Sequence, residues 1–289
     1  MTKRLCRQIG FGKPLLFWGF SLAFGLSRRT SMCSALSSHI LSLLYNQYYF
    51  IFAILPILLF FCGSVMEDDP IIFVLRYGSY KHYFTSKWRS LGVLCSGLWL
   101  GQITILFVTG AGLSVIKQGW DNFSGSSLLK EIAPLLVKSF PGAWVAVFCA
   151  AVYMLMGYWL IALLTLWLGH FLQRQKAIKV LLALYILTIL SIKLPIMSRP
   201  PFCYLTGINH WVLLLHNLTA GWRFPLTVIV TLLFVVTVIC SIQGGWRSAA
   251  HHHRISKGLP AYYRHILFSA SNFLVLAISL ALLVAWVWC

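Results

Sequence analysis

Residues 143–168 read AWVAVFCAAVYMLMGYWLIALLTLWL, a stretch without one charged side chain. A helix rises about 1.5 Å per residue, so about 20 predominantly apolar residues cross the roughly 30 Å hydrocarbon core of a bilayer. This stretch exceeds that length, and it has no polar face to turn toward water. It therefore predicts a membrane-spanning helix.

The same composition extends through the whole chain. Its 289 residues are 60% hydrophobic and only 10% charged, whereas a soluble domain has about 25% charged residues. This excludes an ordinary soluble enzyme. It also excludes a nucleic-acid-binding protein despite the net charge of +18, because no segment could form a solvated basic domain. The prediction is an all-α, polytopic membrane bundle forming a single transmembrane domain over residues 1–289.

Hydropathy divides this domain into candidate spans. Seven apolar runs are expected to cross the bilayer: residues 14–26, 44–65, 91–116, 143–168, 180–197, 226–242 and 266–288. The first run is short. Its alternative is an interfacial helix over residues 3–26, with Trp18 at the lipid headgroups. The bundle is therefore expected to have six or seven transmembrane helices.

The distribution of Lys and Arg predicts the orientation of the chain. With a cytoplasmic N-terminus, the inner connections carry 15 of these residues and the outer connections carry 7. This fits the positive-inside rule, with Arg28 and Arg29 as the main misfit. We therefore expect a multi-pass protein of the cytoplasmic (plasma) membrane.

The sequence lacks the common signatures of membrane chemistry. It has no Walker A loop, no GxSxG, no HExxH and no CxxC pair. None of the five acids lies in a predicted span, which disfavours a proton-coupled transporter. The chain is thus expected to have no catalytic residue, no metal and no cofactor of its own. A bilayer-embedded enzyme is the alternative, with Cys149, His170, His210 and His216 as its candidate residues. A non-transporting scaffold or sensor subunit is a third class.

Residues 67–90, EDDPIIFVLRYGSYKHYFTSKWRS, form an unusual connection on the predicted cytoplasmic side. Three acids begin the segment, and a Tyr-Gly pair breaks its apolar stretch. Aromatic residues then recur at three- and four-residue spacing, which predicts a short amphipathic helix along the inner membrane surface. The aromatic positions are Tyr80, Tyr83, Phe84 and Trp88. Such a helix would either bind a partner or anchor the loop to lipid headgroups.

This segment resembles the cytoplasmic segment after the second span of type II (ABCG-like) ABC exporter permeases. The matching positions are Glu67, Gly78, Ser79, Lys81 and Lys87. The order LRYGS, aromatics and SK is similar to small bacterial permeases that pair with a separate ATPase. The family usually has six spans with both termini inside, whereas seven runs are counted here.

The resemblance implies that the segment is a coupling helix that docks into a groove of a separate ABC ATPase subunit. The residues assigned to this contact are Glu67, Asp68, Gly78, Ser79, Tyr80, Lys81, Tyr83, Phe84 and Lys87. ATP and Mg would be bound by the ATPase, and a second permease, identical or homologous, would complete the transporter within the lipid bilayer. An amphipathic or lipophilic substrate, such as a peptide or drug, would be exported by alternating access.

Three smaller features carry expectations of their own. Gly101, Gly110 and Gly112 in the third predicted span suit close helix packing, a dimer interface or a bend. A disulfide between Cys33 and Cys203 is conceivable, because both lie in predicted outer loops. Residues 251–253 are three consecutive histidines in a basic loop, which suits lipid phosphates or the ATPase better than a metal.

Overall fold

The computed structural model describes residues 2–29, 35–66, 77, 80–115, 134, 136–172, 174–193, 232, 235 and 236. These residues are mostly helical and contain no strand, which confirms the all-α prediction for this part of the chain. The predicted runs 226–242 and 266–288 fall outside the described residues apart from three single positions. The cysteine pair in the outer loops and the three histidines also lie outside them.

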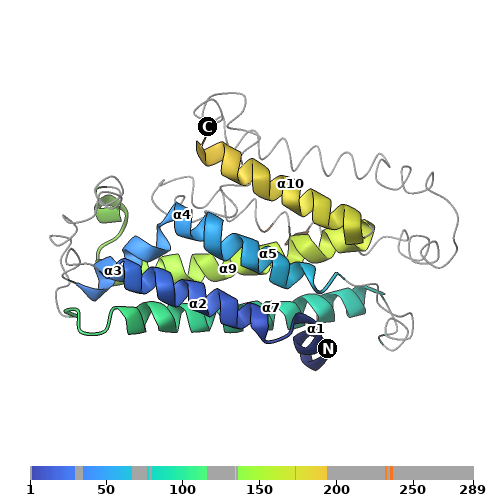
Figure 1. The fold of residues 1–289 in the computed structure, drawn as a ribbon, viewed down its shortest axis with the longest axis horizontal. Coiled ribbons are helices and arrows are strands. Elements are labelled where there is room, and N and C mark those ends of the chain that lie inside the picture. Colours follow the sequence, from blue (N-terminus) through green and yellow to red (C-terminus); the bar gives the residue numbers. More distant parts are fainter. Residues whose placement is uncertain are drawn as a thin grey trace, which may run out of the picture.

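The helices follow one another along the described part of the chain (Figure 1). Their bounds are α1 Thr2–Ile9, α2 Gly12–Ser27, α3 Leu36–Leu44, α4 Gln47–Tyr49, the π-helix η1 Phe50–Ile54, α5 Leu55–Gly63, α7 Tyr80–Thr109, α9 Ala143–Phe171 and α10 Arg174–Lys193.

Two long helices, α7 and α9, form the centre of the bundle and run antiparallel (Figure 1). At one end the rings of Trp88 and Trp159 lie 5.7 Å apart. At the other end the rings of Phe107 and Trp144 lie 6.1 Å apart. Early residues of α7 thus face late residues of α9.

The flanking helices continue this alternation. Helix α2 runs parallel to α7, because Trp18 Nε1 donates to the Leu98 carbonyl and Arg29 donates to the Ala111 carbonyl. Helix α5 runs antiparallel to α7. Chain direction therefore reverses from α2 to α5, from α5 to α7 and from α7 to α9.

Among the described residues, two helices are long and apolar enough to cross a membrane, by length and composition alone. They are His82–Thr109 and Ala143–Gly169, and they lie in the predicted runs 91–116 and 143–168. Shorter apolar helices occupy the runs 14–26 and 44–65. The described helices are thus compatible with insertion in a membrane.

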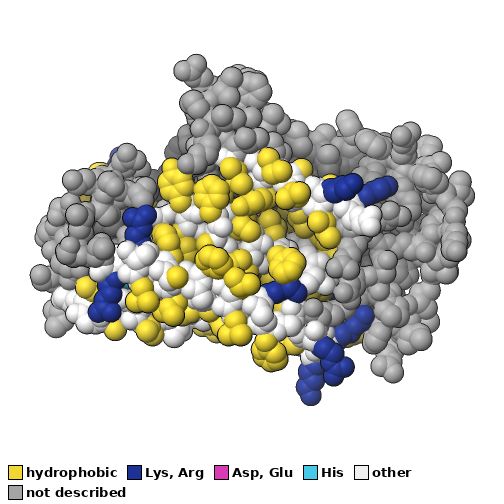
Figure 2. Space-filling view, in the orientation of Figure 1, with side chains coloured by type: hydrophobic (Ala, Val, Ile, Leu, Met, Phe, Trp, Pro, Cys, Tyr) yellow, Lys and Arg dark blue, Asp and Glu magenta, His cyan; other side chains and the backbone are white. Residues whose placement is uncertain are grey.

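The surface of the bundle carries a broad hydrophobic band, with Lys and Arg toward its ends (Figure 2). Large apolar side chains point outward from several helices. Phe148 is 69% exposed and Phe60 is 65% exposed. Soluble monomers rarely expose apolar surface on this scale, so the band needs a lipid or protein covering.

The predicted run 44–65 is not one regular helix. The chain breaks at Tyr45 and Asn46, where Asn46 Oδ1 accepts a hydrogen bond of 2.9 Å from the Tyr49 amide and so begins the next helix. The π-turn Phe50–Ile54 comes next, just before Pro56. Proline has no N–H and its ring collides with the carbonyl four residues earlier, so a widened turn relieves the conflict.

The expected short surface helix is not a separate element. Tyr80–Thr109 is one continuous helix of 30 residues, so the aromatic segment forms the first turns of α7. No glycine or proline lies between residues 80 and 91 to end the helix. At its far end α7 stops at Thr109, before Gly110 and Gly112, rather than at residue 116. Gly112 has φ +89°, which interrupts the helix.

Candidate functional site in the helix bundle

Four polar side chains from four helices meet inside the apolar core. Ser21 comes from α2, Tyr49 from α4, Gln102 from α7 and Tyr158 from α9. All four are buried, and Ser21 and Tyr158 have no exposed surface. We call this group the polar chain.

Hydrogen bonds run through the polar chain in one direction. Tyr158 donates from its hydroxyl to Gln102 Oε1 at 2.5 Å. Gln102 Nε2 donates to the Tyr49 hydroxyl at 3.0 Å. Tyr49 donates to Ser21 Oγ at 2.7 Å, and Ser21 donates to the Phe17 carbonyl at 2.9 Å. Each of the four side chains along this path donates at least one hydrogen bond.

Aromatic rings enclose the polar chain. Phe24 stacks on Tyr49 with the ring centres 4.3 Å apart. Phe17 packs edge-on against Tyr158 at 6.1 Å. An unmade hydrogen bond in such apolar surroundings is costly. The four helices are therefore held in one relative position by polar contacts as well as by packing.

The polar chain is built from neutral side chains. It consists of three hydroxyl groups and one amide, from Ser21, Tyr49, Tyr158 and Gln102. No group of three His, Cys, Asp or Glu side chains able to hold a metal occurs in the described part of the chain. The arrangement links four helices by hydrogen bonds.

The polar chain was not predicted from the sequence. Gln102 was the available signal, because an amide in the middle of the predicted run 91–116 needs a partner on another helix. Its partners could not be read from the sequence. Gln102 is 53 residues from Tyr49 and 56 from Tyr158 along the chain, and any of many hydroxyl groups would have served.

Tryptophan and glycine fix the contacts on both sides of α7. Trp99 Nε1 donates to the Ala151 carbonyl at 2.8 Å, and Trp159 Nε1 donates to Ser96 Oγ at 3.0 Å. A Cβ on Gly101 would collide with the indole of Trp18. Close packing, one of the expectations for Gly101, is thus confirmed within this chain.

A histidine is buried where α3 meets the last turn of α7, in the predicted outer connection 27–43. His39 Nε2 lies 3.2 Å from Thr109 Oγ1. His39 Nδ1 has no hydrogen-bond partner in the described part of the molecule. Burial lowers the pKa of His39, and the positive charge of Arg29 lowers it further. Both effects disfavour the protonated form of this imidazole in the folded protein.

The residues assigned to ATPase coupling fall into three groups. Glu67, Asp68, Gly78 and Ser79 lie outside the described residues. Tyr80 and Lys81 begin α7, and nothing further is described of their side chains. The remaining three, Tyr83, Phe84 and Lys87, are buried at 1%, 5% and 6% exposure.

The burial of these three residues differs from the expectation that they face a partner. Tyr83 packs edge-on against Tyr77, with ring centres 5.5 Å apart, and Lys87 Nζ lies 5.9 Å from the Tyr83 ring centre. Phe84 belongs to the hydrophobic core. An amphipathic pattern predicts that one face is covered, and here that face is covered by this chain.

Two candidate residues of the enzyme alternative, Cys149 and His170, lie in the described part of the chain, and they are far apart. Cys149 is partly buried near the start of α9, and His170 lies near its end, about 20 residues and roughly 30 Å along the same helix. The other two histidines lie outside the described residues. Two further cysteines do meet: Cys62 Sγ and Cys95 Sγ lie 4.0 Å apart, both fully buried.

No protein-family model, curated protein or solved structure matches this chain.

Proposed function

We propose that this chain is the membrane-spanning permease subunit of an ATP-driven ABC exporter. A separate ATPase subunit hydrolyses ATP, and a second permease completes the pathway. The pair moves an amphipathic or lipophilic substrate by alternating access. The chain itself performs no chemical step.

Membrane embedding is supported by three observations together. The bundle exposes a hydrophobic band, basic side chains lie toward the ends of that band (Figure 2), and successive helices alternate in direction. Every charged residue in the described part of the chain is Lys or Arg. A lipid-facing belt bounded by snorkelling cations has this form.

The observation that carries the coupling role is the continuity of α7. Residues 80–90 of the segment that resembles the coupling segment form the first turns of a 30-residue helix. Force applied to the connection before Tyr80 is therefore transmitted along a rigid rod. The rod reaches the polar chain at Gln102, about 22 residues or roughly 33 Å further on.

The chain that contacts α7 at the polar chain, α4 and η1, is irregular and can bend. The break at Asn46 and the π-turn Phe50–Ile54 flank Tyr49, which accepts the hydrogen bond from Gln102. Irregular turns bend more readily than a regular helix. Movement of α7 would thus be absorbed by α4 and η1, while α9 stays packed along α7. Such rigid-body tilting is how alternating access operates.

Burial within the bundle changes which residues should contact the ATPase. Since Tyr83, Phe84 and Lys87 are buried, we assign the docking surface to Glu67, Asp68 and the Gly78–Ser79 pair. Acidic side chains on a partner surface act through charge complementarity, so reversing their charge should prevent association.

The test is affinity purification of the full chain from detergent, with mass spectrometry of the proteins that co-purify. We expect a stoichiometric ATPase carrying a Walker A motif. The double variant Glu67→Lys/Asp68→Lys should lose it while still inserting in the membrane. The control Arg28→Glu/Lys138→Glu reverses two exposed charges at the other end of the bundle and should keep it.

Two results would contradict this proposal. Recovery of the chain alone would contradict the proposed association with an ATPase. Recovery with membrane proteins that lack a Walker A motif would favour a scaffold or sensor subunit instead.

A further inference from the structure

Helix α1 has two unlike faces. Leu5 and Ile9, one turn apart, are 1% and 4% exposed and belong to the hydrophobic core beside α7. Lys3 and Arg7, also one turn apart, are exposed on the other side. The helix is therefore held to the bundle by one face and offers two cations on the other.

A fixed turn separates α1 from α2. Gly10 has φ +71°, a conformation that favours glycine, so the chain changes direction there. Lys13 Nζ donates to the Ile9 carbonyl at 2.7 Å and lies 5.0 Å from the ring centre of Phe60 on α5. Figure 1 shows α1 at the edge of the bundle beside the first part of α7, turned away from the direction of α2.

More exposed cations belong to the same end of the molecule. Arg89 lies in the first third of α7, and Lys176 and Lys179 lie in the first turns of α10. No acid occurs among the described residues. The three acids of residues 67–69 come after α5 along the chain and are outnumbered by the basic residues of this end.

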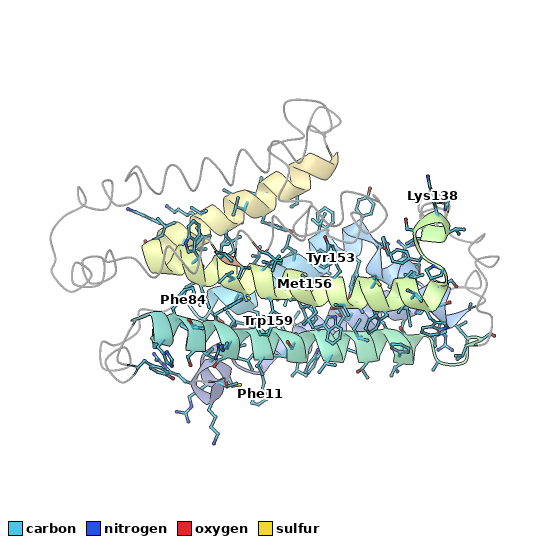
Figure 3. The ribbon with its side chains drawn as sticks, turned by 180° about the vertical axis from the view of Figure 1, so that it is seen from behind. Phe11, Phe84, Lys138, Tyr153, Met156 and Trp159 are labelled. Atoms are coloured by element: carbon cyan, nitrogen blue, oxygen red, sulfur yellow. The ribbon has the colours of Figure 1, made fainter. Side chains whose placement is uncertain are left out.

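Exposed apolar side chains follow the cations of α1 directly along the chain. Phe11 is 89% exposed, Leu15 is 64% exposed and Leu16 is 54% exposed. Figure 3 shows Phe11 projecting from the bundle next to α1, at the opposite end from Lys138. The cations of α1 thus stand at the border between the hydrophobic band and water, where phospholipid phosphates lie.

We propose that this end of the bundle binds the headgroups of anionic phospholipids, with Lys3, Arg7 and Arg89 as the contacts. Among the described residues of this end every charge is positive, exposed apolar side chains begin next to these cations, and α1 is packed against the bundle. A lipid surface would contact both the cations and the exposed apolar side chains next to them. An acidic protein would pair only with the cations. The inference rests on the membrane embedding proposed above and is independent of the ATPase.

The test uses the full chain in nanodiscs of equimolar phosphatidylcholine and phosphatidylglycerol. Phospholipids that remain bound after detergent extraction are counted by native mass spectrometry. We expect enrichment of phosphatidylglycerol, which falls about fivefold for each charge removed in Lys3→Gln/Arg7→Gln. The matched control, Arg28→Gln/Lys138→Gln, removes two exposed charges from the opposite end and should keep the enrichment.

A second arm separates lipid from free phosphate. Inorganic phosphate should displace phosphatidylglycerol no better than chloride at equal ionic strength. Strong displacement would identify a site for free anions and overturn the proposal.

Other results would also overturn it. These are equal retention of both lipids, an equal loss in the control variant, or recovery of an acidic protein at this end. Equal retention would leave membrane embedding intact. Failure of the chain to enter nanodiscs would contradict the embedding as well.

Discussion

Replacing Gln102 by leucine tests whether the polar chain holds the bundle together. The change keeps the size of the side chain and removes both of its hydrogen bonds, the donor to Tyr49 and the acceptor for Tyr158. Tyr49 still donates to Ser21. Tyr158, with no exposed surface, loses the acceptor of its hydroxyl.

The expected loss follows from these contacts. A hydrogen bond between membrane helices contributes about 0.6 kcal/mol on average and about 1.7 kcal/mol at most, so the two bonds together contribute about 1–3 kcal/mol. A buried hydroxyl left without a partner costs about 1–3 kcal/mol. The terms overlap, because the second includes the loss of one bond. We expect Gln102→Leu to lower the free energy of unfolding by about 2–4 kcal/mol.

A double-mutant cycle isolates the orphaned hydroxyl. Tyr158→Phe alone removes one hydrogen bond and should cost about 1–2 kcal/mol. In the double variant Gln102→Leu/Tyr158→Phe no hydroxyl remains to be satisfied. Its loss should therefore be smaller than the sum of the two single losses by at least about 1 kcal/mol.

The assay is unfolding in mixed micelles, monitored by helical circular dichroism. Thr104→Val is the matched control, because Thr104 lies on the same helix, is exposed, and bonds only to the Leu100 carbonyl of α7 itself. It should change stability by less than about 0.5 kcal/mol. If Gln102→Leu behaves like this control, or the two single losses are additive, the polar chain does not hold the helices.

Three further predictions concern packing, pH and thiol exposure. Gly92→Ala should be less stable than Gly97→Ala by about 1–3 kcal/mol in the same assay. A Cβ on Gly92 would collide with the ring of Trp159 on α9, whereas a Cβ on Gly97 has open space. Equal stabilities would refute this packing. Folding lowers the pKa of His39 from the ordinary value of 6.5, so the unfolded state binds the proton more tightly. The contribution of His39 to stability is therefore complete above pH 6.5 and declines as the pH falls below it. A stability–pH profile of His39→Gln should be flatter than the native one below pH 6.5, and parallel profiles would contradict the assignment. Exposed Cys6 should react with maleimide at least about tenfold faster than buried Cys62 in the folded protein, with the difference vanishing on unfolding; equal rates before unfolding would mean that α5 is open to water.

Local composition was sufficient to predict the long helices. Residues 143–168 lie within α9, because an uninterrupted apolar run has only its own backbone to satisfy its hydrogen bonds in an apolar medium. Residues 44–65 are largely helical, as predicted, but they do not form one regular helix. Pro56 signalled an irregularity, but whether it produced a kink, a break or a π-turn depended on neighbouring helices.

The segment around Tyr83 and Phe84 marks the limit of prediction from a pattern. Their spacing correctly indicated a helix with one apolar face. Whether a partner or the chain itself covered that face was a question of tertiary contacts. Those contacts bury both side chains within this molecule.

The sequence by itself predicted a helical protein with helices compatible with insertion in a membrane, since hydropathy and charge are summed along the chain and need no partner. It determined that helices form, about where they lie, and that positive charge gathers in particular connections. Only the tertiary structure decided that Ser21, Tyr49, Gln102 and Tyr158 meet. A hydrogen bond depends on distance and angle in space, and residues far apart along a chain acquire these only when their helices pack.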